Sequence, residues 1–240
     1  MNAIVNKWLK IVQQITKVCL PLSTQCVLCL QPSCTEIALC EPCEKTLPWI
    51  VDACERCGIA VNVGQTLCAQ CLGKNPPFER LSAPFEYAWP INAFISKLKY
   101  GGHLPFGRML GYLLSKHFTC IHPIDTIVAI PLHPLRQKER GFNQCIELGW
   151  QVAKQLNLPL DKRSCTKIID TPSQALLSAS RRSNNLNEKA FCISPDFAAK
   201  HVLVIEDVVT TGTTINAFTR ALKQHGVRTV EILSVCRTSH

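Results

Sequence analysis

The chain has 240 residues, of which 47% are hydrophobic, and a formal net charge of +9 at pH 7. This length suits one medium-sized domain together with a smaller module. No run of 18 apolar residues is present, and lysines interrupt the apolar residues near the N-terminus, so the sequence predicts neither stable membrane insertion nor a signal peptide. We expect residues 1–25 to form an amphipathic helix that packs on the body of the protein, the alternative being a helix on a membrane surface.

Eight of the fifteen cysteines form a repeat of Cys-x-x-Cys pairs. Each cysteine of the second set lies 28 residues after its counterpart, and the eight are Cys26, Cys29, Cys40, Cys43, Cys54, Cys57, Cys68 and Cys71. Two such pairs supply the four thiolates of a closed, structural zinc site. The pattern predicts a double zinc ribbon over residues 26–71 that binds two Zn²⁺ ions in total. Each ion is bound either by the four cysteines of one repeat or by interleaved pairs from both repeats. An iron–sulfur or dithiol redox role is the alternative.

Cysteine-rich chains without an export signal bind metal more often than they form disulfides, so we also predict a cytoplasmic location. The ribbon is acidic, since Lys45 and Arg56 stand against five acidic residues in residues 26–71. Such a surface grips DNA poorly by charge alone, which favours a docking or scaffolding role. The basic excess lies further along the chain and suits phosphate-rich ligands or nucleic acid.

Residues 81–240 have the pattern of an α/β domain that follows a linker containing Gly73, Pro76 and Pro77. Apolar spacing predicts a helix from about residue 91 to the Gly-Gly turn at 101–102, and then a second helix. Lys97 and Lys99 come just before that turn. They are either a solvated helix end or ligand-binding residues.

Asp125–Ile130 is a β-branched run that predicts a strand. It leads into residues 131–144, PLHPLRQKERGFNQ, which we interpret as an anion-binding loop rather than a charged surface loop. Residues 159–190 contain few periodic apolar residues and predict a lid. Within that lid, Arg181 and Arg182 either close over phosphates or remain in solvent.

The most informative stretch is residues 202–214, VLVIEDVVTTGTT. Its four leading apolar residues predict a strand buried on both faces of a parallel sheet, with Glu206 and Asp207 where the strand should end. The Thr- and Gly-rich loop behind them opens a helical pattern, and a helix N-terminus presents N–H groups to an anion. Ligands of open α/β sheets bind at the carboxyl ends of the strands. The stretch therefore predicts a sugar phosphate site.

This stretch closely resembles the phosphoribosyl pyrophosphate (PRPP) motif of type I phosphoribosyltransferases. The ribbons, Lys99-Tyr-Gly-Gly102, Ile130-Pro-Leu-His-Pro134 and Arg140-Gly-Phe-Asn-Gln144 precede it in the order seen in the ComF/GntX family. Members of that family are phosphoribosyltransferase-like proteins associated with bacterial competence. The resemblance implies a type I phosphoribosyltransferase-like α/β fold over residues 81–240, a parallel sheet flanked by helices, behind the double zinc-ribbon module.

The resemblance also implies roles for individual residues. Glu206 and Asp207 would take the ribose 2′- and 3′-hydroxyls as the catalytic pair. The 5-phosphate would be held by Thr210, Thr211, Gly212, Thr213 and Thr214. Pyrophosphate would be held by Pro131, Leu132 and His133, aided by Arg136 or Arg140. Mg²⁺ would bridge pyrophosphate and ribose hydroxyls rather than occupy a protein cage.

Two functions follow from these features. The first is Mg²⁺-dependent transfer of phosphoribosyl from PRPP to a nitrogen nucleophile, with release of pyrophosphate through an oxocarbenium-like centre. No pattern for a general base is visible in the sequence. The second is a non-catalytic module that senses PRPP or a nucleotide, or that handles single-stranded DNA with other competence proteins. Few aromatic residues interleave with the basic clusters, so the sequence indicates no stacking platform for bases.

Overall fold

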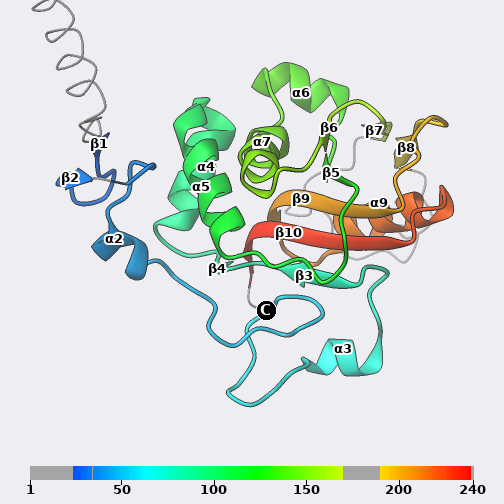
Figure 1. Ribbon diagram of the computed structural model, residues 1–240, viewed down its shortest axis with the longest axis horizontal. Coiled ribbons are helices and arrows are strands. Elements are labelled where there is room, and N and C mark those ends of the chain that lie inside the picture. Colours follow the sequence, from blue (N-terminus) through cyan, green and yellow to red (C-terminus); the bar gives the residue numbers. More distant parts are fainter. Residues whose placement is uncertain (1–23, 34, 170–189, 239–240) are drawn as a thin grey trace, which may run out of the picture. The chain divides into compact units, whose positions relative to one another are not determined.

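The computed structural model describes residues 24–33, 35–169 and 190–238 (Figure 1). Residues 1–23 of the predicted N-terminal helix and residues 170–189 of the predicted lid, with Arg181 and Arg182, lie outside this description. The chain divides into two compact units, residues 1–46 and 47–240. Each unit holds one of the two cysteine sets, whereas the sequence grouped both sets in one module. The domain boundaries stay a prediction.

Residues 24–33 and 35–46, the described part of the N-terminal unit, contain little regular structure. Strands β1 (Thr24–Gln25) and β2 (Pro32–Ser33) pair in an antiparallel fashion, and the helix α2 spans Glu41–Lys45. Between the strands the backbone N–H of Leu30 donates to the carbonyl of Cys26, which closes a tight turn around the first Cys-x-x-Cys pair. Short elements of this kind bury few apolar side chains, so a metal ion bound to the thiols would supply much of the folding free energy.

A six-stranded parallel sheet forms the centre of the second unit. Its order is β3-β10-β9-β5-β6, with β4 also pairing with β10. The strands are β3 (Arg80–Ser82), β4 (Phe85–Glu86), β5 (Thr126–Ala129), β6 (Leu160–Asp161), β9 (His201–Val209) and β10 (Thr229–Arg237). The side chains of residues 202–205 have no exposed surface, which confirms the predicted strand buried on both faces. Strands β7 (Cys165–Lys167) and β8 (Phe191–Ile193) form a separate antiparallel pair.

Helices cover both faces of this sheet (Figure 1). The helices that contact its strands are α5 (Leu104–Lys116), α7 (Gln144–Leu156) and α9 (Thr213–Gln224), and α4 (Ile91–Gly101) packs on α5. The same unit also contains the short helices α3 (Ala69–Gly73) and α6 (Pro134–Arg140). On one face Phe218 of α9 packs in a core with Val202 and Val204. On the other face α7 approaches Ile205, since a Cβ added at Gly149 would lie 3.7 Å from that side chain. The predicted sheet flanked by helices is confirmed.

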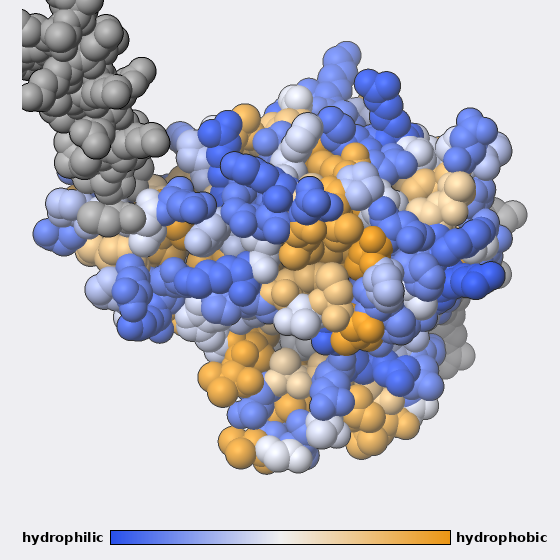
Figure 2. All heavy atoms as spheres, in the orientation of Figure 1, coloured by the Kyte–Doolittle hydropathy of each residue, from blue (hydrophilic) through white to orange (hydrophobic). Residues whose placement is uncertain are grey.

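The segment 131–144 differs from the predicted loop, because Pro134–Arg140 form the helix α6. Pro134 occupies the first turn, where its fixed φ favours a helix. The Nδ1 of His133 accepts from the backbone N–H of Leu135 at 3.4 Å, and Gly141 ends the helix with φ at +78°. The basic side chains of this segment therefore project from a helix. Figure 2 shows hydrophilic side chains over α6, which buries none of its residues.

In the part of the chain that the structure describes, no helix combines the length and apolar character needed to cross a membrane. The cytoplasmic location stays a prediction.

Candidate functional site

Glu206 and Asp207 lie within β9 rather than at its end, because the strand continues to Val209. Their side chains are buried, with exposed fractions of 9% and 3%. The two carboxyl groups and the thiol of Cys145 lie within 4.8 Å of one another. Cys145 comes from the first turn of α7, so two elements build this acidic centre.

Glu206 is held by two donors. Its Oε1 accepts from the Cys145 thiol at 3.4 Å and from the backbone N–H of Asp207 at 3.0 Å. Burial, followed by the charge of Asp207, raises the pKa of Glu206 to about 8. Burial, followed by the nearby carboxylates, also raises the pKa of Cys145 well above its usual value. At neutral pH, Glu206 is therefore mostly protonated and Cys145 is a neutral thiol.

Asp207 is paired with Lys99, whose Nζ lies 2.9 Å from Oδ2 of the carboxylate. Burial lowers the pKa of Lys99, but the charge and hydrogen bond of Asp207, together with the nearby Glu206 and Cys145, more than offset this effect, so the net shift is upward and the ammonium is retained. Lys99 is therefore a partner of the acidic centre rather than a solvated helix end. Lys97 differs, since its Nζ lies 5.4 Å from the centre of the Phe106 ring.

The Thr- and Gly-rich loop connects β9 to α9, as the sequence predicts. Gly212 has φ at +78° and forms the N-cap of α9 without a side-chain hydrogen bond to the helix. The hydroxyls of Thr211 and Thr213 lie 2.9 Å apart. The guanidinium of Arg237, a buried residue at the end of β10, donates to the carbonyl of Thr210. The loop is thus held at one side, and the helix N-terminus offers backbone N–H groups to an anion.

A cavity of about 430 Å³ lies beside this centre, between the end of α4 and α6. It is lined by Lys99, Tyr100, Gly102, Arg136, Glu139 and Arg140. The guanidinium carbon of Arg140 lies 5.6 Å from the centre of the Tyr100 ring, and its Nη1 donates to Oε1 of Gln144 at 2.9 Å. Three cationic side chains against one carboxylate give the cavity a positive lining. Lys99 lines this cavity and also contacts Asp207.

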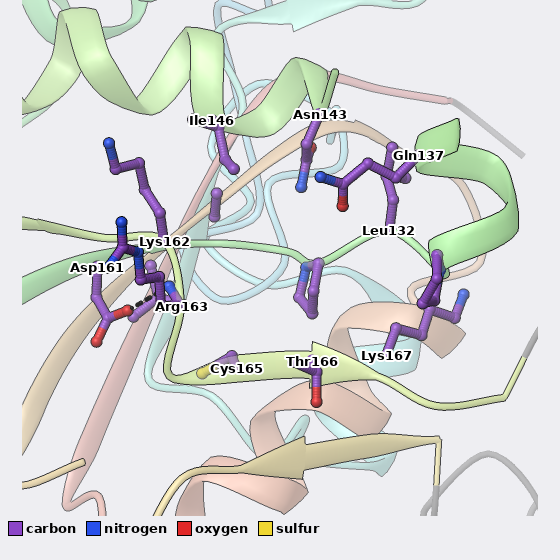
Figure 3. A pocket seen from close by; sticks show the side chains of 14 residues that line it. Leu132, Gln137, Asn143, Ile146, Asp161, Lys162, Arg163, Cys165, Thr166 and Lys167 are labelled. Atoms are coloured by element: carbon purple, nitrogen blue, oxygen red, sulfur yellow. Dashed lines mark hydrogen bonds between the residues drawn. The ribbon is translucent and has the colours of Figure 1, made fainter. Parts of the chain in front are cut away.

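A smaller cavity of about 150 Å³ opens where β5 and β6 end (Figure 3). Figure 3 shows Asn143 and Ile146 of α7 on one side of it and Cys165, Thr166 and Lys167 on the other. Asn143 fixes this region, because its Nδ2 donates to the carbonyl of Ile130 at 2.9 Å and its Oδ1 accepts from the backbone N–H of Cys145 at 2.9 Å. The end of β5 and the start of α7 are thereby joined.

The predicted pyrophosphate residues are divided between the two cavities. Pro131 and Leu132 line the smaller cavity, Arg136 and Arg140 line the larger one, and His133 caps α6. Sequence reasoning assigned no role to Tyr100, Cys145, Lys162, Arg163, Lys167 and Arg237. The sequence offered one indication that Cys145 belongs to the site: this residue comes two positions after Asn143, at the start of a helix.

The eight repeat cysteines form two groups, each with four sulfur atoms within 4.8 Å of one another. The groups are Cys26, Cys29, Cys40 and Cys43, and Cys54, Cys57, Cys68 and Cys71, so the thiols gather within each repeat and are not interleaved. Two four-cysteine groups of this kind could bind zinc, and their sulfur-only donor set fits structural zinc sites.

Electrostatics also favour a divalent cation in each group. Burial opposes ionisation of Cys26, but backbone N–H groups lower its pKa to about 6, and the same balance lowers the pKa of Cys54 to about 7. The contact with the Cys40 thiol, followed by burial, raises the pKa of Cys43 to about 12. Burial, with the charge of Cys54 among the other causes, raises the pKa of Cys57 to about 11. Four thiolates therefore need a cation to coexist.

Comparison with known proteins agrees with this architecture. The model of the phosphoribosyl transferase domain family matches residues 143–240. "DNA utilization protein YhgH" of Shigella flexneri is 30% identical over 220 residues, which is 89% of this chain and 96% of that protein. "Competence protein F" of Haemophilus influenzae is 27% identical over 83% of this chain and 90% of its own length. "Competence protein ComFC" of Streptococcus pneumoniae is 28% identical over 93% and 97%, respectively.

The parallel sheet with helices on both faces, the Glu-Asp pair and the Thr-rich loop define a type I phosphoribosyltransferase fold. Its two four-cysteine clusters are compatible with zinc-ribbon modules. Because these relatives match the chain over nearly their whole length, the chain belongs to the ComF/GntX family.

Proposed function

We propose that the protein binds PRPP together with Mg²⁺ and transfers its phosphoribosyl group to a nitrogen nucleophile in a process of DNA uptake or utilisation. The observation that carries the proposal is the acidic pair of β9, which lies directly before a phosphate-type loop and beside a cationic cavity. The names of the relatives, which refer to competence and DNA utilisation, support the biological setting.

Each part of the site has a distinct task in this proposal. Asp207, with Glu206, accepts hydrogen bonds from the ribose hydroxyls. The loop Thr210–Thr214 holds the 5-phosphate with backbone N–H groups and hydroxyls. Arg136 or Arg140 binds the pyrophosphate in the α4–α6 cavity and stabilises its negative charge as it leaves, and Pro131–His133 form the pyrophosphate loop that leads into α6. Mg²⁺ bound together with PRPP would neutralise phosphate charge.

The protein side of the reaction is then positioning and charge stabilisation. The bond from C1 of the ribose to the pyrophosphate oxygen breaks as the nitrogen nucleophile approaches C1, and positive charge develops on the sugar as it does in glycoside cleavage. Holding both reactants in line lowers the barrier by removing translational freedom. In this proposal the carboxylate that accepts the ribose hydroxyls, Asp207, also supplies negative charge that stabilises the developing cation.

Asp207→Asn is the sharpest test of PRPP binding. The amide keeps the size of the side chain but removes its negative charge. The carboxylate that pairs with Lys99 and accepts hydrogen bonds from the ribose hydroxyls is therefore lost. We expect the wild type to bind PRPP with Mg²⁺ in calorimetry and Asp207→Asn to lose detectable binding. Absence of heat with the wild type would overturn the proposal, and pyrophosphate release across a panel of bases and amines would test turnover.

Binding of single-stranded DNA is a second candidate function, and a specific arrangement favours it. Trp150 is 54% exposed, with the Lys162 ammonium 4.5 Å from the centre of its ring, and Tyr100 is 78% exposed beside Arg140. The sequence indicated no stacking platform, because these partners are distant along the chain. Exposed rings beside cations are suited to stacking bases while the phosphates are neutralised.

Trp150→Ala tests this second function. Stacking of one base on an aromatic ring contributes about 1–3 kcal/mol, so we expect roughly tenfold weaker binding of a short single-stranded oligonucleotide in gel shifts. Trp89→Ala is the matched control, because Trp89 is 71% exposed and lies elsewhere in the same unit. Affinity should also fall with rising salt. Equal affinity of the two variants, or no salt dependence, would count against the DNA role.

A further inference from the structure

Lys99 occupies a position that joins two parts of the candidate site. Its Nζ lies 2.9 Å from Oδ2 of Asp207, and the same side chain lines the 430 Å³ cavity between α4 and α6. The side chain is 19% exposed and that of Asp207 is 5% exposed. The pair is thus shielded from solvent on most sides but accessible from the cavity.

The cavity has the chemistry of an anion site. Lys99, Arg136 and Arg140 supply cations from two helices, and Glu139 is the one carboxylate among the described residues that line it. Gly102 lets the chain turn at the end of α4 with φ at +61°, which places the backbone of the Tyr100–Gly102 segment against the cavity. A planar guanidinium can donate hydrogen bonds to two phosphate oxygens at once, and an ammonium group carries three N–H donors on one atom.

We infer that Lys99 couples the binding of the ribose to that of the diphosphate, by donating one hydrogen bond to Asp207 and another to a diphosphate oxygen bound in the α4–α6 cavity. This inference rests on the proposed PRPP site and adds a residue to it. An ammonium group can make both contacts at once, since only one of its three N–H donors is needed for Asp207. A diphosphate in the cavity would then hold Lys99 in place beside the carboxylate that accepts the ribose hydroxyls.

The alternative is that Lys99 acts only as the counter-ion of a buried carboxylate. In that case its removal would disturb Asp207 and weaken every ligand that uses Asp207, with or without a diphosphate. A diphosphate contact instead predicts that ligands carrying this group lose much more affinity than ligands without it, and that pyrophosphate, which does not use Asp207, is weakened too. Inorganic pyrophosphate, PRPP and ribose 5-phosphate therefore form the discriminating set of probes.

The experiment is calorimetric titration of the full chain with these three compounds in the presence of Mg²⁺. Lys99→Met keeps the length of the side chain but removes its donors. We expect it to weaken pyrophosphate and PRPP by about tenfold or more, as for loss of a hydrogen bond to a charged group, and ribose 5-phosphate by about threefold or less. Lys97→Met is the matched control on the same helix and should leave all three affinities unchanged within about twofold.

Lys99→Met leaves the Asp207 carboxylate buried without its partner, which could prevent folding. A second comparison avoids this problem. Asp207→Asn and the double variant Lys99→Met/Asp207→Asn both lack that buried charge, and pyrophosphate should bind the double variant about tenfold more weakly. Unchanged pyrophosphate affinity, or equal losses for pyrophosphate and ribose 5-phosphate, would overturn the inference. If the wild type binds pyrophosphate but does not bind PRPP, the proposed function is wrong, while the role of Lys99 at the diphosphate still stands. Binding of neither compound would overturn both.

Discussion

At the scale of single residues, the two neighbouring carboxyl groups of β9 have different chemical states. Asp207 forms an ion pair with the Lys99 ammonium, whereas burial keeps Glu206 mostly protonated at neutral pH. A protonated carboxyl can donate a hydrogen bond as well as accept one, so the pair can match both oxygens of a vicinal diol. Cys145 supports this division, because its thiol donates to Glu206 without adding charge.

Glu206 gives the folded protein a specific pH dependence. Its folded pKa of about 8 lies above the ordinary value of 4.5, so between these values the folded state binds more protons than the unfolded state. Stability attributable to this group therefore falls as the pH rises through that window. Glu206→Gln cannot ionise, and its side-chain oxygen can still accept from Cys145 and Asp207.

We expect the melting temperature of Glu206→Gln, relative to wild type, to increase from pH 5 to pH 8. The change should correspond to about 1 kcal/mol or more, because each unit of pKa shift is worth about 1.4 kcal/mol. Thermal unfolding at several pH values measures the difference. A melting-temperature difference that stays constant with pH would show that Glu206 ionises normally in the fold.

At the scale of elements, the packing of α5 on α7 determines where the site residues of α7 lie. A Cβ at Gly111 of α5 would come within 2.8 Å of the carbonyl oxygen of Leu148, a backbone atom that cannot move without shifting α7. The first turn of α7 carries Cys145 and begins at Asn143, which binds the end of β5. Close helix packing thus fixes the distance between the acidic centre and the smaller cavity.

Gly111→Ala should therefore destabilise the second unit, although alanine is the better helix former. Overpacking a tight contact costs about 1–3 kcal/mol and outweighs the roughly 1 kcal/mol gained in helix propensity. Gly73→Ala in α3 is the control, because a Cβ there meets no atom within 4 Å and should be neutral or stabilising. Chemical denaturation of both variants provides the comparison. An unchanged stability of Gly111→Ala would mean that α5 can move away from α7.

The elements that were predictable from the sequence are those set by local patterns. The apolar run 202–205 reports burial on both faces of a sheet, and the Gly-Gly turn at 101–102 ends a helix wherever that helix packs. The pairing of Lys99 with Asp207 was not predictable, because it joins positions far apart in the chain through tertiary packing. The same holds for the cavity, which requires α6, a short helix whose residues are all at least partly exposed and show no clear apolar face.

At the scale of the whole molecule, the two cysteine clusters have different structural settings. The second cluster is built into the unit that contains the parallel sheet. The backbone N–H of Leu81 in β3 donates to the carbonyl of Arg56, and a Cβ at Gly58 would lie 2.8 Å from the Leu81 side chain. Strand β3 in turn pairs with β10. The first cluster belongs to the N-terminal unit, where its four sulfur atoms lie within 4.8 Å of one another.

This difference predicts unequal effects of two equivalent substitutions, Cys29→Ser and Cys57→Ser. Each removes the second cysteine of the first pair in its repeat, so each should reduce the zinc content from two ions per chain to one. Because zinc binding supplies folding free energy to such clusters, loss of the second ion should loosen β3 and lower the stability of the sheet. Loss of the first ion should leave the sheet unchanged.

Metal analysis with hydrogen exchange of the β9 and β10 amides measures both effects. We expect faster exchange in Cys57→Ser and wild-type exchange in Cys29→Ser, each with one bound zinc. Equal protection of the sheet in the two variants would show that the second cluster is only attached to the sheet and does not support it. Retention of two ions in either variant would contradict the assignment of four thiolates to each site. The comparison therefore shows whether the second ribbon stabilises the phosphoribosyltransferase fold while the first ribbon is available for other contacts.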